Sequence, residues 1–353
     1  MVIREDYAIA VERIYPDRFA IIEEAIKHIE TPALLGYHTP AYMNALTEVL
    51  HDNPLYIAAF FEEKLAGFLA LRWCRGKFGT VINGLPFFGP NGGPILTNCG
   101  LSHADVVMQQ LVNELRAFAS EIGAVSVVCY TPFLYNAALF EQAFLADRVI
   151  ERVTQYLDLR GFAGWSSHIR HKSLGRAKSK GVTVRNGGPS DIARLLEIYH
   201  ENYARKGILL KPESYFYQAV EQLSPLGIAR FTVAEWQDRV VACLITIQAG
   251  VTVSYNVPCC EQAAQTTQAN SLLIDEAVRA LMPQGYCFWN WEASPGKESP
   301  VYKFKERWGS LEAYYKILLS YPQGTKVFAG LSQQEVASAY PFYFVIPFED
   351  LNN

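Results

Sequence analysis

A short segment near the end of the chain, 301-VYKFKERWG-309, combines cations with aromatic residues. On a helix with about 100° between residues, its apolar face comprises Val301, Phe304 and Trp308. Lys303 and Arg307 lie opposite that face, toward solvent. Lys305 lies at the edge of the apolar face, where partial burial makes a lysine sensitive to nearby negative charge. We therefore predict that Lys305 is catalytic and stabilises charge during a transfer reaction.

A carboxylate follows the apolar strand-like run 286-YCFWNW-291. Glu292 is placed to take a proton from an attacking amine, directly or through water, and we predict it as a second catalytic residue. The alternative is a loop carboxylate that pairs with Lys297 or another nearby cation.

The expected strand 252-TVSYNV-257 carries a tyrosine between polar residues. Ser254 and Asn256 share one face of this strand, and Tyr255 points to the other. Tyr255 is a candidate substrate contact, although a half-buried aromatic is also common in sheets.

Residues 159–190 contain no acidic side chain but many cations. Such a concentration creates a local positive field on an acidic protein, which suits a phosphate-bearing ligand. Arg170 and Arg176 are the substrate-binding candidates in this segment. The alternative is a solvated helix face.

Two further segments have residue types that bind anions. The loop 84-GLPFFGPNGGPIL-96 contains Gly92 and Gly93, which allow close approach of the backbone to a phosphate or sugar, or simply form a tight turn. Arg205 closes the expected helix 199-YHENYARKG-207, where it can bind substrate phosphate or complement the helix dipole.

Composition limits the class of protein. The chain has 353 residues, of which 50% are hydrophobic and 19% charged, so it is globular and long enough for about two domains. A net charge of −4 argues against a general DNA-binding protein. The seven cysteines form no CxxC pair and are predicted to be free thiols, and we predict no metal site. No signal peptide or transmembrane run is evident, which predicts a cytoplasmic protein.

The expected elements repeat in order along the chain. The segments 57-IAAFFEEKLAGFLAL-71 and 233-VAEWQDRVVACLITI-247 both read as strand, polar turn and strand. A helix capped by Ser102 has its counterpart in residues 269–282, and 125-VSVVCY-130 matches 286-YCFWNW-291. We predict two tandem α/β copies, each with a mixed, partly antiparallel sheet flanked by helices.

The chain resembles the FemABX-like aminoacyltransferases of peptidoglycan assembly, which have a double GNAT acyltransferase architecture. The resemblance is carried by 169-IRHKSLGRAKSKGVTV-184, 203-YARKG-207 and the Phe304–Lys305 pair of 301-VYKFKERWG-309, and it covers roughly residues 55–320. It implies a first GNAT-like domain at residues 1–160, completed by 321–353, and a second at 161–320. It also implies that Phe304 contacts substrate and that Lys305 lies beside the transferring group.

The resemblance implies transfer of an acyl or aminoacyl group to an amine of a small-molecule or lipid-linked cell-wall precursor. The donor would be an aminoacyl-tRNA, whose charged end the protein would bind, or acyl-CoA, and no cofactor would be tightly bound. GNAT enzymes that bind CoA usually carry a glycine-rich strand-to-helix loop, whereas this chain has 258-PCCEQAAQTTQAN-270. Two alternatives remain open: an acyl-CoA-dependent N-acyltransferase acting on another amine, and a non-catalytic anion-binding module.

Overall fold

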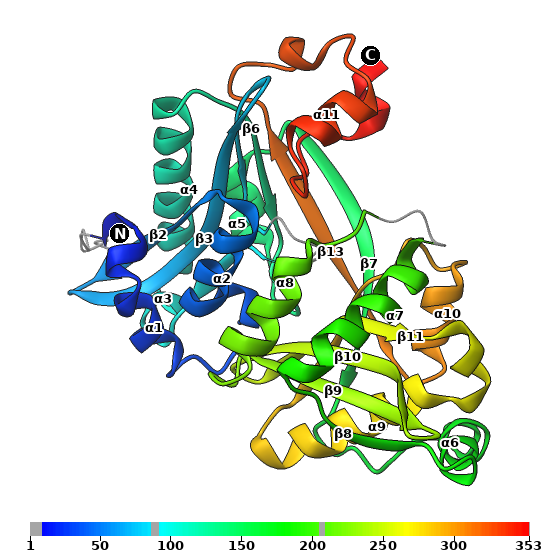
Figure 1. The fold of residues 1–353 in the computed structure, drawn as a ribbon. Coiled ribbons are helices and arrows are strands. Elements are labelled where there is room, and N and C mark those ends of the chain that lie inside the picture. Colours follow the sequence, from blue (N-terminus) through cyan, green and yellow to red (C-terminus); the bar gives the residue numbers. More distant parts are fainter. Residues whose placement is uncertain (1–8, 86–91, 205–208, 353) are drawn as a thin grey trace. The chain divides into compact units, whose positions relative to one another are not determined.

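The computed structural model describes residues 9–85, 92–204 and 209–352 (Figure 1). The chain divides into two compact units, unit 1 (residues 1–29, 52–152 and 314–353) and unit 2 (residues 30–51 and 153–313). The predicted domains, residues 1–160 and 161–320, differ from these units at their borders. The largest difference is residues 30–51, which fold with unit 2 rather than with their sequence neighbours.

Unit 1 is built on a mixed sheet with the strand order β1-β2-β3-β4-β6-β13 and with β5 beside β3. The strands are β1 (Ile9–Ile14), β2 (Asn53–Phe61), β3 (Lys64–Gly76), β4 (Gly79–Asn83), β5 (Pro94–Leu96), β6 (Ala124–Tyr130) and β13 (Leu311–Ser320). Pairing within this sheet is antiparallel except between β4 and β6, which run parallel. A parallel pair requires a crossover, and helix α4 supplies it.

The helices of unit 1 include α1 (Ala20–Ile26), α3 (Asn98–Leu101), α4 (Ala104–Glu121), α5 (Ala138–Phe144) and α11 (Gln333–Ala339). Helix α4 lies along one face of the sheet and packs on β1, β2, β3 and β6 (Figure 1). Its buried side chains recur every three to four residues, from Val107 to Phe118, as the amphipathic pattern requires. The predicted Ser102 cap is wrong, because α4 begins at Ala104 and the Ser102 hydroxyl donates to the Cys99 carbonyl instead.

Unit 2 has the sheet order β7-β12-β11-β10-β9-β8. The strands are β7 (Arg148–Asp158), β8 (Thr183–Asn186), β9 (Ala229–Trp236), β10 (Arg239–Ala249), β11 (Thr252–Cys260) and β12 (Phe288–Ala293). Here β11 and β12 are the parallel pair, and α9 (Ala269–Leu281) is the crossover between them. Hairpin, third strand, helix and parallel strand thus follow in the same order as in unit 1, so the predicted fold of two α/β copies with mixed sheets is confirmed.

Two sets of helices flank the sheet of unit 2. Helix α9 packs on β9 and β10, and Tyr255 of β11 faces this side. Successive strand residues alternate in direction, so Asn256 faces the other side, where it contacts α8. The remaining helical segments are α2 (Pro40–Leu50), η3 (Ile169–Leu174), α6 (Gly175–Ser179), α7 (Ile192–Ala204), α8 (Glu213–Tyr217), η5 (Gln218–Leu223), η6 (Gln262–Thr267) and α10 (Pro300–Glu306).

The segment of residues 30–51 is part of unit 2 because of its packing. Helix α2 packs on α8 and η5, and the short turn η2 (Gly36–His38) packs on β10 and β11. Thr39 caps α2 by accepting from the Tyr42 N–H at 3.3 Å, and Pro40 takes the first helical position, as expected from the sequence. Gly36 is required here, because a Cβ would lie 2.5 Å from Ile247 Cγ2.

Membrane-spanning helices and metal-binding clusters are both absent from the described ranges. No helix among them is long and apolar enough to cross a membrane. Those same residues hold no group of three or more His, Cys, Asp and Glu side chains arranged to bind a metal ion. All seven cysteines are free thiols.

Candidate functional site

The candidate site of unit 2 lies where the parallel strands β11 and β12 stop pairing. The two strands pair at Thr252 with Phe288, Val253 with Trp289 and Ser254 with Asn290, and no further. Strand β11 continues along β10 as far as Cys260, whereas β12 is irregular after Asn290. Beyond the pair Ser254–Asn290, β11 and β12 therefore no longer cover each other's edges.

Glu292 occupies a β-bulge at this point. In the pairing of β12 with β7, Asn290 lies opposite Tyr156 and Ala293 lies opposite Thr154, so two residues of β12 lie opposite one residue of β7. Glu292 has a φ of 61°, which is unusual for a residue other than glycine. Its N–H donates to the Asn290 side-chain oxygen at 2.9 Å, which holds the bulge. Strain of this kind is found at functional sites more often than elsewhere.

A chain of buried hydrogen bonds leads away from the Glu292 carboxyl. The Tyr37 hydroxyl donates to Glu292 Oε1. The same hydroxyl oxygen accepts from Asn256 Nδ2 at 3.0 Å. Asn256 Oδ1 in turn accepts from the Tyr215 hydroxyl at 2.6 Å and from Lys211 Nζ at 3.3 Å. These residues come from η2, β11, α8 and the segment before α8, so the fold of unit 2 brings together parts of the sequence that are far apart.

Lys305 binds the backbone next to Glu292. It is 3% exposed, and its ammonium donates to the Glu292 carbonyl at 3.1 Å, the Ala293 carbonyl at 2.7 Å and the Ser294 hydroxyl at 3.0 Å. An ammonium has three N–H donors, and these three acceptors match them. The predicted position at the rim of an apolar face is wrong, because α10 buries Tyr302 and Lys305 and exposes Val301.

Burial shifts the ionisation of the charged groups in this network. Desolvation raises the pKa of Glu292 well above its ordinary value, while the charge of Lys305 acts in the opposite direction. Desolvation lowers the pKa of Lys305 to about 8, opposed by the Glu292 charge. Lys211, which is 8% exposed, has its pKa lowered to about 7 by burial. A carboxyl group and two amines that titrate closer to neutrality than usual can exchange protons in catalysis.

Comparisons with known proteins agree with this architecture. Residues 169–288 match the family described as an acetyltransferase (GNAT) domain. The crystal structure of FemX aligns with a TM-score of 0.67 at 11% identity, over 86% of this chain and 96% of that chain. L-PGS from Bacillus licheniformis aligns with a TM-score of 0.58 at 14% identity, over 89% and 94% of the two chains. The protein has a tandem GNAT fold.

A third neighbour is a tandem GNAT protein from the clavulanic acid biosynthesis pathway, with a TM-score of 0.51 at 10% identity over 90% of this chain and 99% of that one. A comparison of the sequence with curated proteins finds no match. The resemblance to FemABX-like proteins is thus confirmed as a likeness of fold. The residues that match the acetyltransferase (GNAT) domain family all lie within unit 2.

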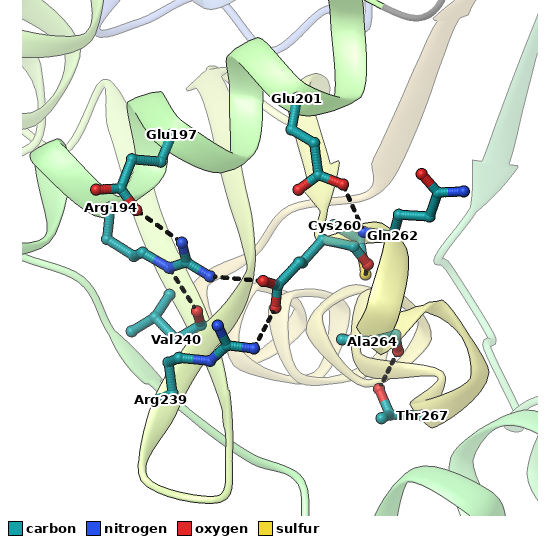
Figure 2. Close-up of polar contacts among 10 residues, drawn as sticks. Arg194, Glu197, Glu201, Arg239, Val240, Cys260, Gln262, Ala264 and Thr267 are labelled. Atoms are coloured by element: carbon teal, nitrogen blue, oxygen red, sulfur yellow. Dashed lines mark hydrogen bonds and ion pairs between the residues drawn. The ribbon is translucent and has the colours of Figure 1, made fainter.

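The connection from β11 to α9 is the place where CoA-binding GNAT proteins usually carry their glycine-rich loop. In this GNAT domain, carboxylates occupy its start (Figure 2). The Gln262 N–H donates to Glu201 Oε1 at 3.1 Å, and Glu261 accepts from Arg239 at 2.7 Å and pairs with Arg194 at 3.2 Å. A pyrophosphate here would find the Gln262 N–H already engaged by a carboxylate, and Glu261 already paired with two arginines.

The predicted substrate contacts Tyr255 and Phe304 belong to the core of unit 2. Tyr255 is buried against Trp289 and Trp291, and its hydroxyl accepts from Asn270 at 3.2 Å. Phe304 is partly buried in the same aromatic cluster. The structure thus places both behind the sheet surface that carries Asn256, and their predicted contact with substrate stays untested.

The remaining predicted residues that the structure describes do not join the Glu292 network. Arg170 and Arg176 are exposed on η3 and α6. Arg205 lies outside the described residues. Gly92 and Gly93 belong to unit 1, where Gly93 has a φ of 76° and a Cβ on it would lie 2.4 Å from the Tyr130 carbonyl oxygen. Close packing of the backbone accounts for this glycine without a ligand.

The alternative interpretation of Glu292 was a carboxylate that pairs with Lys297 or another nearby cation, and the structure does not show the pairing with Lys297. Lys297 pairs with Glu312 at 2.8 Å, and Glu292 is bound by Tyr37. Sequence reasoning missed Tyr37 and Lys211. A lone lysine within the run 209-LLKP-212 was the available signal for Lys211, and nothing local marked Tyr37.

Proposed function

We propose that the protein is an acyltransferase that forms an amide on an amine acceptor, with Glu292 as the general base. The observation that carries the proposal is a buried carboxyl in a left-handed bulge, at the point where the parallel strands of a GNAT domain separate. An amine must lose a proton when it attacks an acyl carbon, and a carboxyl with a raised pKa is suited to take that proton near neutral pH.

The proposed reaction needs no covalent enzyme intermediate. The amine nitrogen attacks the carbonyl carbon of an ester or thioester, a C–N bond forms and the C–O or C–S bond breaks. Glu292 takes one proton from the nitrogen and returns it to the leaving oxygen or sulfur, so the carboxyl ends the cycle as it began. The rate gain from such a base is about 10²–10⁴-fold, and positioning of the two substrates adds to it.

For the donor we propose an ester, such as the end of a charged tRNA, in preference to acyl-CoA. The Glu201 carboxylate of α7 supports this choice, because it occupies the Gln262 N–H at the start of the β11–α9 connection, where a pyrophosphate would need a free donor. The exposed cations of residues 170–180 are a surface that an RNA phosphate backbone would favour. For the acceptor we propose the amine of a peptidoglycan precursor, which is the class that the resemblance to FemABX-like enzymes implies.

An acyl-CoA-dependent N-acyltransferase is the second candidate. The match of residues 169–288 to the acetyltransferase (GNAT) domain family favours it. The two candidates are separated by thermal shift with acetyl-CoA, a UDP-linked muropeptide and a non-hydrolysable charged-tRNA analogue. Stabilisation by the muropeptide and the RNA analogue is the expected result, and stabilisation by acetyl-CoA alone would overturn the ester proposal.

A turnover assay tests the chemistry, with the donor and the acceptor that stabilise the protein in the thermal-shift experiment as its substrates. Glu292→Gln keeps the shape of the side chain and is expected to lower kcat by about 10²–10⁴-fold. Wild-type kcat in Glu292→Gln would refute the base, and binding without any turnover by the wild type would indicate a non-catalytic anion-binding module.

We propose that Lys305 supports catalysis in two ways: its hydrogen bonds hold the backbone of Glu292, and its positive charge acts on the Glu292 carboxyl. This role differs from the predicted one, in which Lys305 stabilises charge during the transfer reaction. Lys305→Met is expected to lower kcat and also the free energy of unfolding, because the Ala293 carbonyl and the Ser294 hydroxyl lose a charged partner. A loss of kcat with unchanged stability would favour direct action on the substrate instead.

A further inference from the structure

The hydrogen bonds between Lys211 and Glu292 all run in one direction. Lys211 Nζ donates to Asn256 Oδ1, Asn256 Nδ2 donates to the Tyr37 oxygen, and the Tyr37 hydroxyl donates to Glu292. Lys211, Asn256 and Glu292 are each less than 10% exposed, and Tyr37 is 1% exposed. The four residues therefore form a buried chain that begins at an amine and ends at a carboxyl.

The charge of the lysine fixes this direction. A protonated lysine has no acceptor, so only the oxygen of the Asn256 amide can face it, and the amide nitrogen must then face Tyr37. The tyrosine oxygen receives that N–H, so its single hydroxyl hydrogen is left for Glu292. A neutral amine can accept as well as donate, and it would permit the reverse order.

Further titratable groups face each end of the chain. Glu292 is faced by Tyr37 from η2 and by Lys305 from α10. Lys211 is faced by Tyr215 of α8, whose ring lies 4.5 Å from Nζ, and by Tyr199 of α7, whose hydroxyl accepts from the Lys211 N–H at 2.9 Å. The hydrogen bonds of Asn256 and Tyr37 connect Lys211 to the Glu292 carboxyl.

We propose that Lys211 is a positioning residue for Glu292, acting through Asn256 and Tyr37. Its ammonium orients the amide, the amide orients the tyrosine hydroxyl, and the hydroxyl stabilises the ionised carboxyl through Oε1. Within the described part of the chain no side chain or backbone group binds Glu292 Oε2, which is the oxygen that would take the proton. The inference rests on the proposed role of Glu292 as base.

The experiment measures the ionisation of Glu292 directly, by ¹³C NMR titration of glutamate side-chain carboxyls, with the Glu292 signal assigned from its loss in Glu292→Gln. Lys211→Met and Tyr37→Phe are each expected to raise the titration midpoint by about one pH unit or more, because each removes support for the carboxylate. The double variant is expected to shift the midpoint no further than the larger single shift. Lys303→Met, which removes an exposed cation of the same unit, is expected to leave the midpoint unchanged.

An unchanged midpoint in Tyr37→Phe, which lacks only one oxygen atom, would overturn the inference even if Lys211→Met failed to fold. Additive shifts in the double variant would also overturn it, since they would indicate that the lysine acts through space rather than through the chain. The acid limb of the kcat/KM profile is expected to move with the midpoint. If the midpoint moves as expected but Glu292→Gln retains wild-type turnover, the chain stands and the proposed function is what fails.

Discussion

The burial of Lys211 predicts a specific dependence of stability on pH. Its pKa lies at about 7 in the folded protein, against an ordinary value of 10.5, because burial disfavours the charged amine. Between these two values the unfolded chain binds a proton that the folded chain does not. Stability should therefore rise with pH across this window, and the cost of burying the lysine should reach its full size below about pH 7.

The size of the effect follows from the two pKa values. The cost of keeping Lys211 buried is about 3 kcal/mol at about pH 8.5 and about 5 kcal/mol at about pH 6. Lys211→Met removes this cost and adds a packing change that does not depend on pH. The difference in unfolding free energy between variant and parent should therefore change by about 2 kcal/mol between the two pH values, in favour of the variant at the lower pH.

The assay is urea unfolding at both pH values, with Glu292→Gln as the parent so that this carboxyl cannot titrate. Lys303→Met in the same parent is the control, because Lys303 is an exposed lysine of the same unit. If the free energies of unfolding of Lys211→Met and its parent change equally between the two pH values, the reasoning is refuted. That result would mean that the Lys211 ammonium reaches water in the folded protein.

Two further substitutions test the packing of each unit by urea unfolding. Gly36→Ala should destabilise unit 2 by about 1–3 kcal/mol, because its Cβ would overlap β10. The control is Gly188→Ala, which should have little effect because the space around Gly188 is open. Equal losses of stability in the two variants would contradict the close approach at Gly36. Asp52→Asn should destabilise unit 1 by about 3–5 kcal/mol, because it removes the carboxylate that pairs with the buried Arg72. Asp158 forms an exposed ion pair with Arg160, and Asp158→Asn should lower the free energy of unfolding by no more than about 1 kcal/mol. A similar loss of stability in Asp52→Asn and Asp158→Asn would contradict the argument from burial.

The fold was accessible from the sequence because its signals are local. The hairpins β2–β3 and β9–β10 each consist of two apolar runs around a polar turn, and this pattern repeats between the two halves of the chain. What the pattern could not give is the membership of residues 30–51. That segment lies in unit 2 because of contacts such as the fit of Gly36 against β10, and no periodicity encodes a contact between distant segments.

The site was only partly accessible for the same reason. Glu292 was found because it directly follows an apolar strand, but its bulge depends on pairing with β7, and Tyr37 lies 255 residues away in sequence. On β11 the alternation of faces was read correctly, yet the aromatic Tyr255 was preferred to Asn256. A tyrosine packed among tryptophans gains more by burial, whereas the asparagine needs hydrogen-bond partners, and these come from other parts of unit 2.

The two buried lysines show why residue type and spacing did not settle the catalytic assignment. Lys305 was singled out as the cation of the site, but its three donors are matched by the backbone and hydroxyl groups next to Glu292, so its ammonium is held in place. Lys211 reaches the same carboxyl through two neutral side chains. Lys305 thus acts on Glu292 by its charge and by holding the adjacent backbone, whereas Lys211 can set the direction of a proton. A change in protonation at Lys211 would reorient the hydroxyl that binds the base, and the pH dependence of turnover should therefore follow Lys211 as well as Glu292.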